Sequence, residues 1–137
     1  MLSSHETLLP AGWPRPRGYA NGIAAHGRLV FTAGIIGWDE NERLVGTDLV
    51  EQFGQVLRNT LAVLGEAGAG AQHVVRMTWF ITSRDEYLAR LKEIGIVYQS
   101  VFGRHFPVMA VVQVSALIEP AAKIEIETTA VIAHELS

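Results

Sequence analysis

The chain has 137 residues, a length typical of one domain, and we expect residues 1–137 to form a single one. Apolar residues make up 49% of the chain and charged residues only 18%, which excludes a disordered protein and favours a packed core with some apolar surface buried between subunits. The net charge of −3 and the lack of a Lys/Arg run argue against nucleic acid and anionic membranes as partners.

Several kinds of site and location are excluded by what the sequence lacks. Without cysteine there can be no disulfide, thiol catalysis or thiolate metal site. Residues 1–13 carry no basic stretch followed by a long apolar run, as a signal peptide needs, and no apolar run is long enough to span a membrane. We therefore expect a cytoplasmic protein.

The first third of the chain is expected to be mostly irregular or extended. Residues 1–18 predict an irregular lead-in, because turn-forming Pro and Gly residues gather at its end. Two apolar segments, 23–25 and 29–33, flank the short link His26-Gly27 and predict a β-hairpin. Residues 34–46 are rich in Gly, Asp, Glu and Asn and predict a loop.

Two segments predict amphipathic helices. Asp48 and Glu51 form a capping box before apolar residues at helical spacing, so we expect a helix over 49–67, ended by the following Gly-Ala-Gly. Ser83 and Glu86 form a second capping box, and a second apolar stripe predicts a helix that runs to Phe102.

Three further segments, 74–82, 108–114 and 123–132, have the β-branched and alternating composition of strands. The resulting order is β-β-α-β-α-β-β, an α+β fold with one mixed sheet. Right-handed crossovers should place both helices on one face of that sheet. The other face, on which we expect apolar residues such as Trp79, Met109 or Val111, must then be covered by further copies of the chain.

An ordered set of short motifs resembles one known family, the reactive intermediate deaminase (Rid/YjgF) family. The matching segments between Tyr19 and Ile132 are Tyr19–Gly22, Leu29–Gly34, the first helix with Glu51, Gln52 and Asn59, Thr78-x-Phe80, Tyr98 and Phe102 before Phe106-Pro107, and Lys123–Glu127. The resemblance implies a chorismate-mutase-like fold and a homotrimer with clefts between subunits. It also implies hydrolysis of reactive enamines or imines to a keto acid and ammonia, with no metal or organic cofactor.

The resemblance also implies which residues form the cleft. Glu125 matches the family's glutamate, which orients the attacking water. The expected substrate-binding residues are Tyr19, Ala33, Gly34, Ile35, Trp79, Gly95, Phe106 and Met109. Four of them depart from the pattern: Met109 replaces the arginine that grips the substrate carboxylate, Ala33 a serine, Ile35 a glutamine and Gly95 an asparagine found in some relatives.

The loss of the arginine has an energetic consequence. An arginine holds a carboxylate through two charge-assisted hydrogen bonds, whereas methionine offers only packing. Removing one partner of a buried pair costs about 3–5 kcal/mol, and about 1.4 kcal/mol is a factor of ten in affinity. A small 2-imino acid should therefore bind hundreds of times more weakly to this chain than to an arginine-bearing relative.

Three functions remain open at this point. The first is a hydrolase for an enamine or imine that lacks the usual carboxylate, with Glu125 orienting water. The second is a trimer that binds a small molecule without catalysis. The third is an endoribonuclease, a role ascribed to some relatives, against which the acidic composition argues.

Alternative roles also stay open for individual residues. Arg17, Arg104 or His105 could replace the missing arginine, although such residues are more often solvated. Glu125 could be a strand carboxylate that pairs with Lys123 or with water, and Tyr19 could serve only in packing. The five histidines are scattered and show no metal-ligand spacing, so no metal site is expected.

Overall fold

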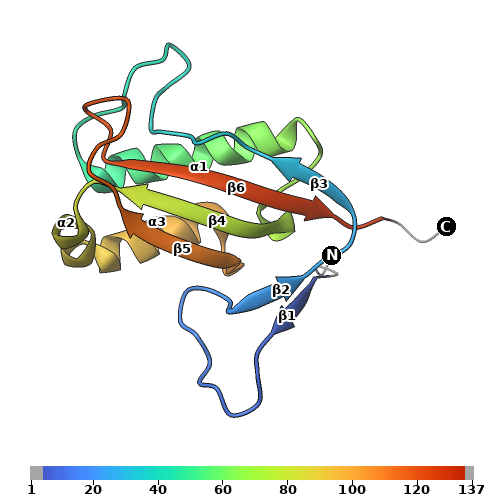
Figure 1. The fold of residues 1–137 in the computed structure, drawn as a ribbon. Helices are drawn as coiled ribbons and strands as arrows, with labels where there is room; N and C mark the ends of the chain where they lie inside the picture. The colour runs from blue at the N-terminus through green and yellow to red at the C-terminus, as the bar shows by residue number, and fades with distance from the viewer. Residues whose placement is uncertain (1–4, 135–137) are drawn as a thin grey trace.

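The computed structural model describes residues 5–134, and Figure 1 shows how its elements are arranged. The elements in chain order are β1 (Glu6–Leu8), β2 (Gly22–Ala24), β3 (Arg28–Phe31), α1 (Leu49–Gly65), a 3-10 turn η1 (Ala71–His73), β4 (Val74–Ile81), α2 (Arg84–Ala89), α3 (Leu91–Phe102), β5 (Val108–Gln113) and β6 (Ile124–Ile132). The expected α+β class is confirmed, and so is the chorismate-mutase-like arrangement of a mixed sheet with its helices on one face.

The main sheet has the strand order β3-β6-β4-β5. Its central strand β6 is antiparallel to β3 and β4, whereas β4 and β5 are parallel and joined by the crossover through α2 and α3. The helices α1 and α3 lie behind this sheet in Figure 1 and leave its other face open. We call the two sides the helix face and the open face.

The capping residues position the helices as expected. Asp48 Oδ2 accepts a hydrogen bond from the Glu51 amide at 3.1 Å, and Ser83 Oγ accepts one from the Glu86 amide at 3.1 Å. The second predicted helix is nevertheless two helices, because the backbone leaves helical geometry at Arg90 (φ −116°, ψ 17°). The Arg90 guanidinium bonds both Asp48 and Glu93, which ties the break to the start of α1.

The prediction of a hairpin between residues 23–25 and 29–33 was wrong. β2 pairs instead with β1, within the lead-in that was expected to be irregular, and β3 pairs with β6. The two-residue link at His26 suits a tight turn, but long-range pairing with the end of β6 prevails over it. Gly27 has φ 147°, a conformation that favours glycine, and its Cα lies so close to the Ile132 carbonyl that a Cβ would collide with it.

The strands β1 and β2 with their connection, residues 5–24, form a small unit that we call the arm. It projects from the main sheet in Figure 1. An isolated bridge between Ala20 and Val108 and a hydrogen bond between the Ala20 amide and the Pro107 carbonyl, 3.0 Å long, attach its end to β5. The arm is therefore held at its ends and open along its length.

The placement of Trp79, Met109 and Val111 on the uncovered face was also wrong. Met109 pairs with Met77 and Val111 pairs with Trp79, and these residues face the helices. Trp79 is only 3% exposed and its ring lies 4.8 Å from that of Phe53 on α1. The open face instead carries other exposed apolar side chains, since Leu29, Phe31 and Val112 are 58%, 66% and 42% exposed there.

None of the helices within residues 5–134 is both long and apolar enough to cross a membrane.

Candidate functional site

Glu125 lies on the open face of the sheet, near the start of β6 and opposite Phe80 of β4. It is half-buried, and within residues 5–134 its carboxylate forms neither a hydrogen bond nor an ion pair. The expected alternative, a pair with Lys123, was wrong, because the Lys123 ammonium bonds Glu86 at 2.8 Å. Glu125 is thus a carboxylate with its acceptor oxygens available for a ligand or water.

The segment 33–35 lies directly against Glu125. The amide and carbonyl of Ile35 bond to Ile126 at 2.9 Å each, which holds this segment beside β6. A Cβ on Gly34 would lie 2.5 Å from Glu125 Oε2, so only a glycine lets the carboxylate come this close. The Ala33 carbonyl accepts the Thr32 hydroxyl at 2.8 Å, whereas in the described chain the backbone groups of Gly34 have no protein partner. Glu125 therefore offers acceptor oxygens close to Gly34, whose backbone groups are also available to a ligand.

Met109, Trp79, Gly95 and Phe106 come together elsewhere, on the helix face. They line a space of about 270 Å³ between β4, β5 and α3, which we call the aromatic pocket. The Tyr98 and Phe106 rings stack there, with centroids 5.6 Å apart and an angle of 14° between their planes. No charged side chain is among the described residues that line it, so the pocket has an uncharged wall where the family pattern has an arginine.

The Tyr98 hydroxyl ties this pocket to the segment before β5. Burial raises the pKa of Tyr98, so the hydroxyl stays protonated and donates to the His105 carbonyl at 2.5 Å. The His105 ring is held in turn, since its Nε2 lies 2.6 Å from the Val74 carbonyl. A carbonyl only accepts, so this nitrogen must carry the proton.

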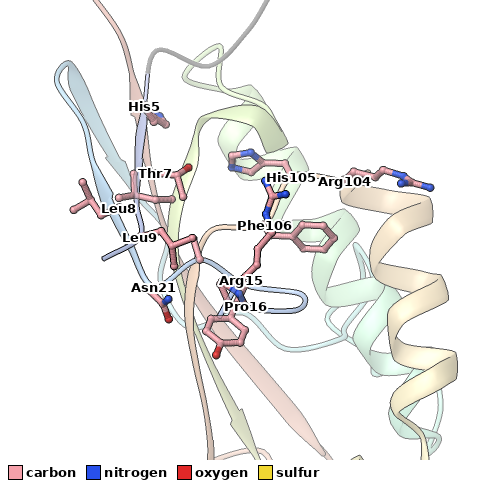
Figure 2. Close-up of a pocket in the computed structure, with 13 residues that line it drawn as sticks. His5, Thr7, Leu8, Leu9, Arg15, Pro16, Asn21, Arg104, His105 and Phe106 are labelled. Atoms are coloured by element: carbon pink, nitrogen blue, oxygen red, sulfur yellow. The ribbon is translucent and has the colours of Figure 1, made fainter. Parts of the chain in front are cut away.

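Tyr19 lines a different space, about 540 Å³ in volume, between the arm and the body (Figure 2). We call it the arm cavity. Arg104 and His105 also line it, but neither lines the aromatic pocket, and Arg17 lines neither space. Within one chain, none of the three residues considered as replacements for the missing arginine thus stands beside Met109.

The expected site residues therefore fall into three places within one chain. Glu125 and segment 33–35 lie on the open face, the residues around Met109 lie on the helix face, and Tyr19 lies beneath the arm; Phe106 is the wall that joins the last two. Arg15 also lines the arm cavity, and sequence reasoning did not single it out. Its only signal is its place in the proline-rich run ahead of Tyr19.

Among residues 5–134 there is no group of three or more histidine or carboxylate side chains placed to hold a metal ion.

Comparisons with known proteins relate the chain to one family. Residues 14–132 match the family model described as endoribonuclease L-PSP. The chain is similar to human 2-iminobutanoate/2-iminopropanoate deaminase, with 30% identity over 105 residues, which cover 76% of this chain and 73% of the human protein.

Two solved structures have similar folds. One is a Rid-family protein of unknown function from Yersinia pestis, YyfB, with 32% identity, a TM-score of 0.81 and coverage of 93% of this chain and 98% of the other. The other is Escherichia coli TdcF with bound serine, with 29% identity, a TM-score of 0.67 and coverage of 93% and 99%.

Proposed function

The chain belongs to the reactive intermediate deaminase (Rid/YjgF) family, and on that premise we propose that it is an enamine or imine hydrolase. Water adds to the carbon of the C=N bond, the nitrogen takes up a proton, and the resulting carbinolamine collapses to a carbonyl compound and ammonia. The reaction needs a group that orients water and accepts its proton.

The single observation that supports this function most is the state of Glu125. A carboxylate that no cation of residues 5–134 neutralises, and that lies close to Gly34, can accept a proton from water. The backbone amide of Gly34 can at the same time stabilise charge on the substrate.

The substrate class follows from the aromatic pocket. Met109 and its neighbours give an apolar wall without a cation, so we propose a substrate that lacks a carboxylate or carries an apolar group in its place. Desolvation of an unpaired carboxylate in such a pocket is unfavourable.

The site is proposed to form between copies of the chain. Glu125 and Met109 lie on opposite faces of the sheet, so one chain cannot present both to one small substrate. The apolar open face, with Phe31 66% exposed, also favours association. We propose a homotrimer with intersubunit clefts, located in the cytoplasm. Light scattering should give about three times the 15.0 kDa of one chain.

The test is ammonia release from imines generated in the assay. An amino acid oxidase supplies carboxylated imines, and an amine oxidase acting on benzylamine supplies one without a carboxylate. We expect faster hydrolysis of the second kind. Glu125→Gln should lower the rate about 10²–10⁴-fold, while Glu127→Gln, two residues along the same face, should leave it unchanged.

Other outcomes contradict the proposal and identify the alternatives. A ligand that raises the melting temperature without any turnover indicates a binding protein. RNA cleavage by the pure protein that Glu125→Gln abolishes, with no effect on imines, indicates a ribonuclease.

A further inference from the structure

The arm cavity has a charge pattern unlike that of the whole chain. The protein has 14 acidic and 11 basic residues, yet the cavity is lined by Arg15, Arg104, His5 and His105 and by no carboxylate among the described residues. The ion pairs of residues 5–134 use Arg90 and Lys123, and neither of the two cavity arginines has a protein partner there. Two arginines thus line one cavity that has no carboxylate among its described lining residues.

Arg15 is the better placed of the two arginines. In Figure 2 its side chain extends from the arm toward the body, and its guanidinium lies beside the His105 ring, whereas the Arg104 side chain points away from the arm. An anion in the cavity can therefore form a bidentate contact with Arg15, while Arg104 adds only its longer-range field.

The inner wall of the cavity is fixed. The bond from His105 Nε2 to the Val74 carbonyl, 2.6 Å long, and the bond from the Tyr98 hydroxyl to the His105 carbonyl hold this residue on the body. Because this wall is already fixed, a ligand that binds against it does not have to order it, which lowers the entropic cost of binding.

The outer wall is apolar. Leu8 and Leu9 of the arm are 43% and 44% exposed, and Phe106 closes the opposite side. An inorganic anion would leave these side chains unused. A volume of about 540 Å³ is in the range of small-molecule sites.

We infer that the arm cavity is a binding site for a small organic anion, whose carboxylate is held by Arg15 and whose apolar part packs on Leu8, Leu9 and Phe106. Within one chain the site is separate from Glu125, and the inference does not depend on the proposed hydrolysis.

The test is isothermal titration calorimetry of the full chain with 3-phenylpropanoate. Its neutral and cationic analogues, 3-phenylpropanol and 3-phenylpropylamine, and inorganic phosphate serve as comparison probes. We expect saturable binding of the carboxylate, with the alcohol, the amine and phosphate each at least tenfold weaker. Arg15→Gln should weaken carboxylate binding about tenfold or more, and Arg104→Gln should weaken it less.

Arg17→Gln is the matched control. It removes the same charge two residues along the chain from Arg15, and the Arg17 side chain does not line the cavity. It should change the affinity less than twofold. Equal losses in the two variants, binding of the alcohol as tight as that of the carboxylate, binding of phosphate as tight as that of the carboxylate, or no saturable binding would overturn the inference. Glu125→Gln should bind the carboxylate as the wild type does, so the binding result can be interpreted even if the hydrolase proposal fails.

Discussion

The aromatic pocket and the arm cavity share Phe106 as a wall, but their other walls differ in origin and in charge. The walls of the aromatic pocket are part of the core, with Trp79 3% exposed and Tyr98 5% exposed. The arm cavity lies between the body and the arm, and its lining residues Leu8, Leu9 and Arg15 on the arm are exposed. Residues of the aromatic pocket contribute to both stability and specificity, whereas the exposed residues of the arm cavity can be substituted with little effect on the fold.

The largest expected effect tests this difference directly. Trp79→Ala should lower the free energy of unfolding by about 3–5 kcal/mol, because it leaves a cavity in the core. Arg15→Gln should change it by less than about 0.5 kcal/mol, as surface substitutions do. Urea unfolding measures both, and Trp13→Ala, which removes a tryptophan that is 59% exposed, is the control. Similar losses from all three variants would erase the distinction between the cavities.

A second variant converts the character of the aromatic pocket. Met109→Arg should raise the affinity for benzoate about a hundredfold, since a guanidinium then faces the carboxylate. The measurement is calorimetry in an Arg15→Gln background, which removes the anchor of the arm cavity. Met109→Gln introduces a polar side chain without a charge, and it should raise the affinity for benzoate little. An equal gain from glutamine would mean that charge is not what this pocket lacks.

A smaller effect is expected at the close contact with Glu125. Gly34→Ala places a Cβ 2.5 Å from the present position of Glu125 Oε2, and the flexible carboxylate must move away. Because a displacement of about 1 Å can cost up to 10²-fold in rate, imine hydrolysis should fall about ten- to hundredfold, with little change in melting temperature. Gly65→Ala, where a Cβ meets nothing within 4 Å, is the control. Full activity of Gly34→Ala would separate Glu125 from the reaction.

The smallest effect concerns acid stability at the base of the arm. Burial, followed by the nearby His5 and His105, lowers the pKa of His73 below its ordinary value of 6.5. Its Nδ1 accepts the Gly70 amide at 2.9 Å, a bond that protonation of this nitrogen breaks. The neutral form is thus favoured by folding, so this contribution is complete above about pH 6.5 and is lost as the pH falls through the lowered pKa.

Urea unfolding at a series of pH values measures this contribution. Between pH 7 and 5, His73→Gln should lose less stability than the wild type. His26→Gln, which changes an exposed histidine, should follow the wild type. A steeper loss in His73→Gln than in the wild type would reverse the sign and contradict this explanation.

The sequence predicted the parts of the fold that local chemistry determines. The caps Asp48 and Ser83 begin helices as expected, and the strands 74–82, 108–114 and 123–132 differ from the observed ones by one residue at an end. The sequence did not predict which distant segments pair, as the wrongly predicted hairpin around Gly27 shows. The break at Arg90 depends on Asp48, 42 residues away, and no local pattern contains it.

The candidate site residues stay a prediction from the sequence, and their arrangement could not be predicted from it. Alternation along β5 assigns Met109 to one face, but which face the helices cover depends on the register with Trp79 and its neighbours. The available carboxylate of Glu125 depends on Lys123 bonding Glu86 instead, which is a matter of reach between α2 and β6. A cavity formed by a projecting arm leaves no periodic signal at all.

The contact of Gly27 with the end of β6 limits which substitutions this chain can accept. The backbone passes the Ile132 carbonyl with room for a hydrogen atom only, in a conformation that other residues rarely adopt. Exposed side chains of the arm, such as Trp13, can be exchanged with little effect on the main sheet, whereas any side chain at this crossing must push β3 away from β6. One atom-wide passage thus separates a segment that has such tolerant positions from the body of the fold.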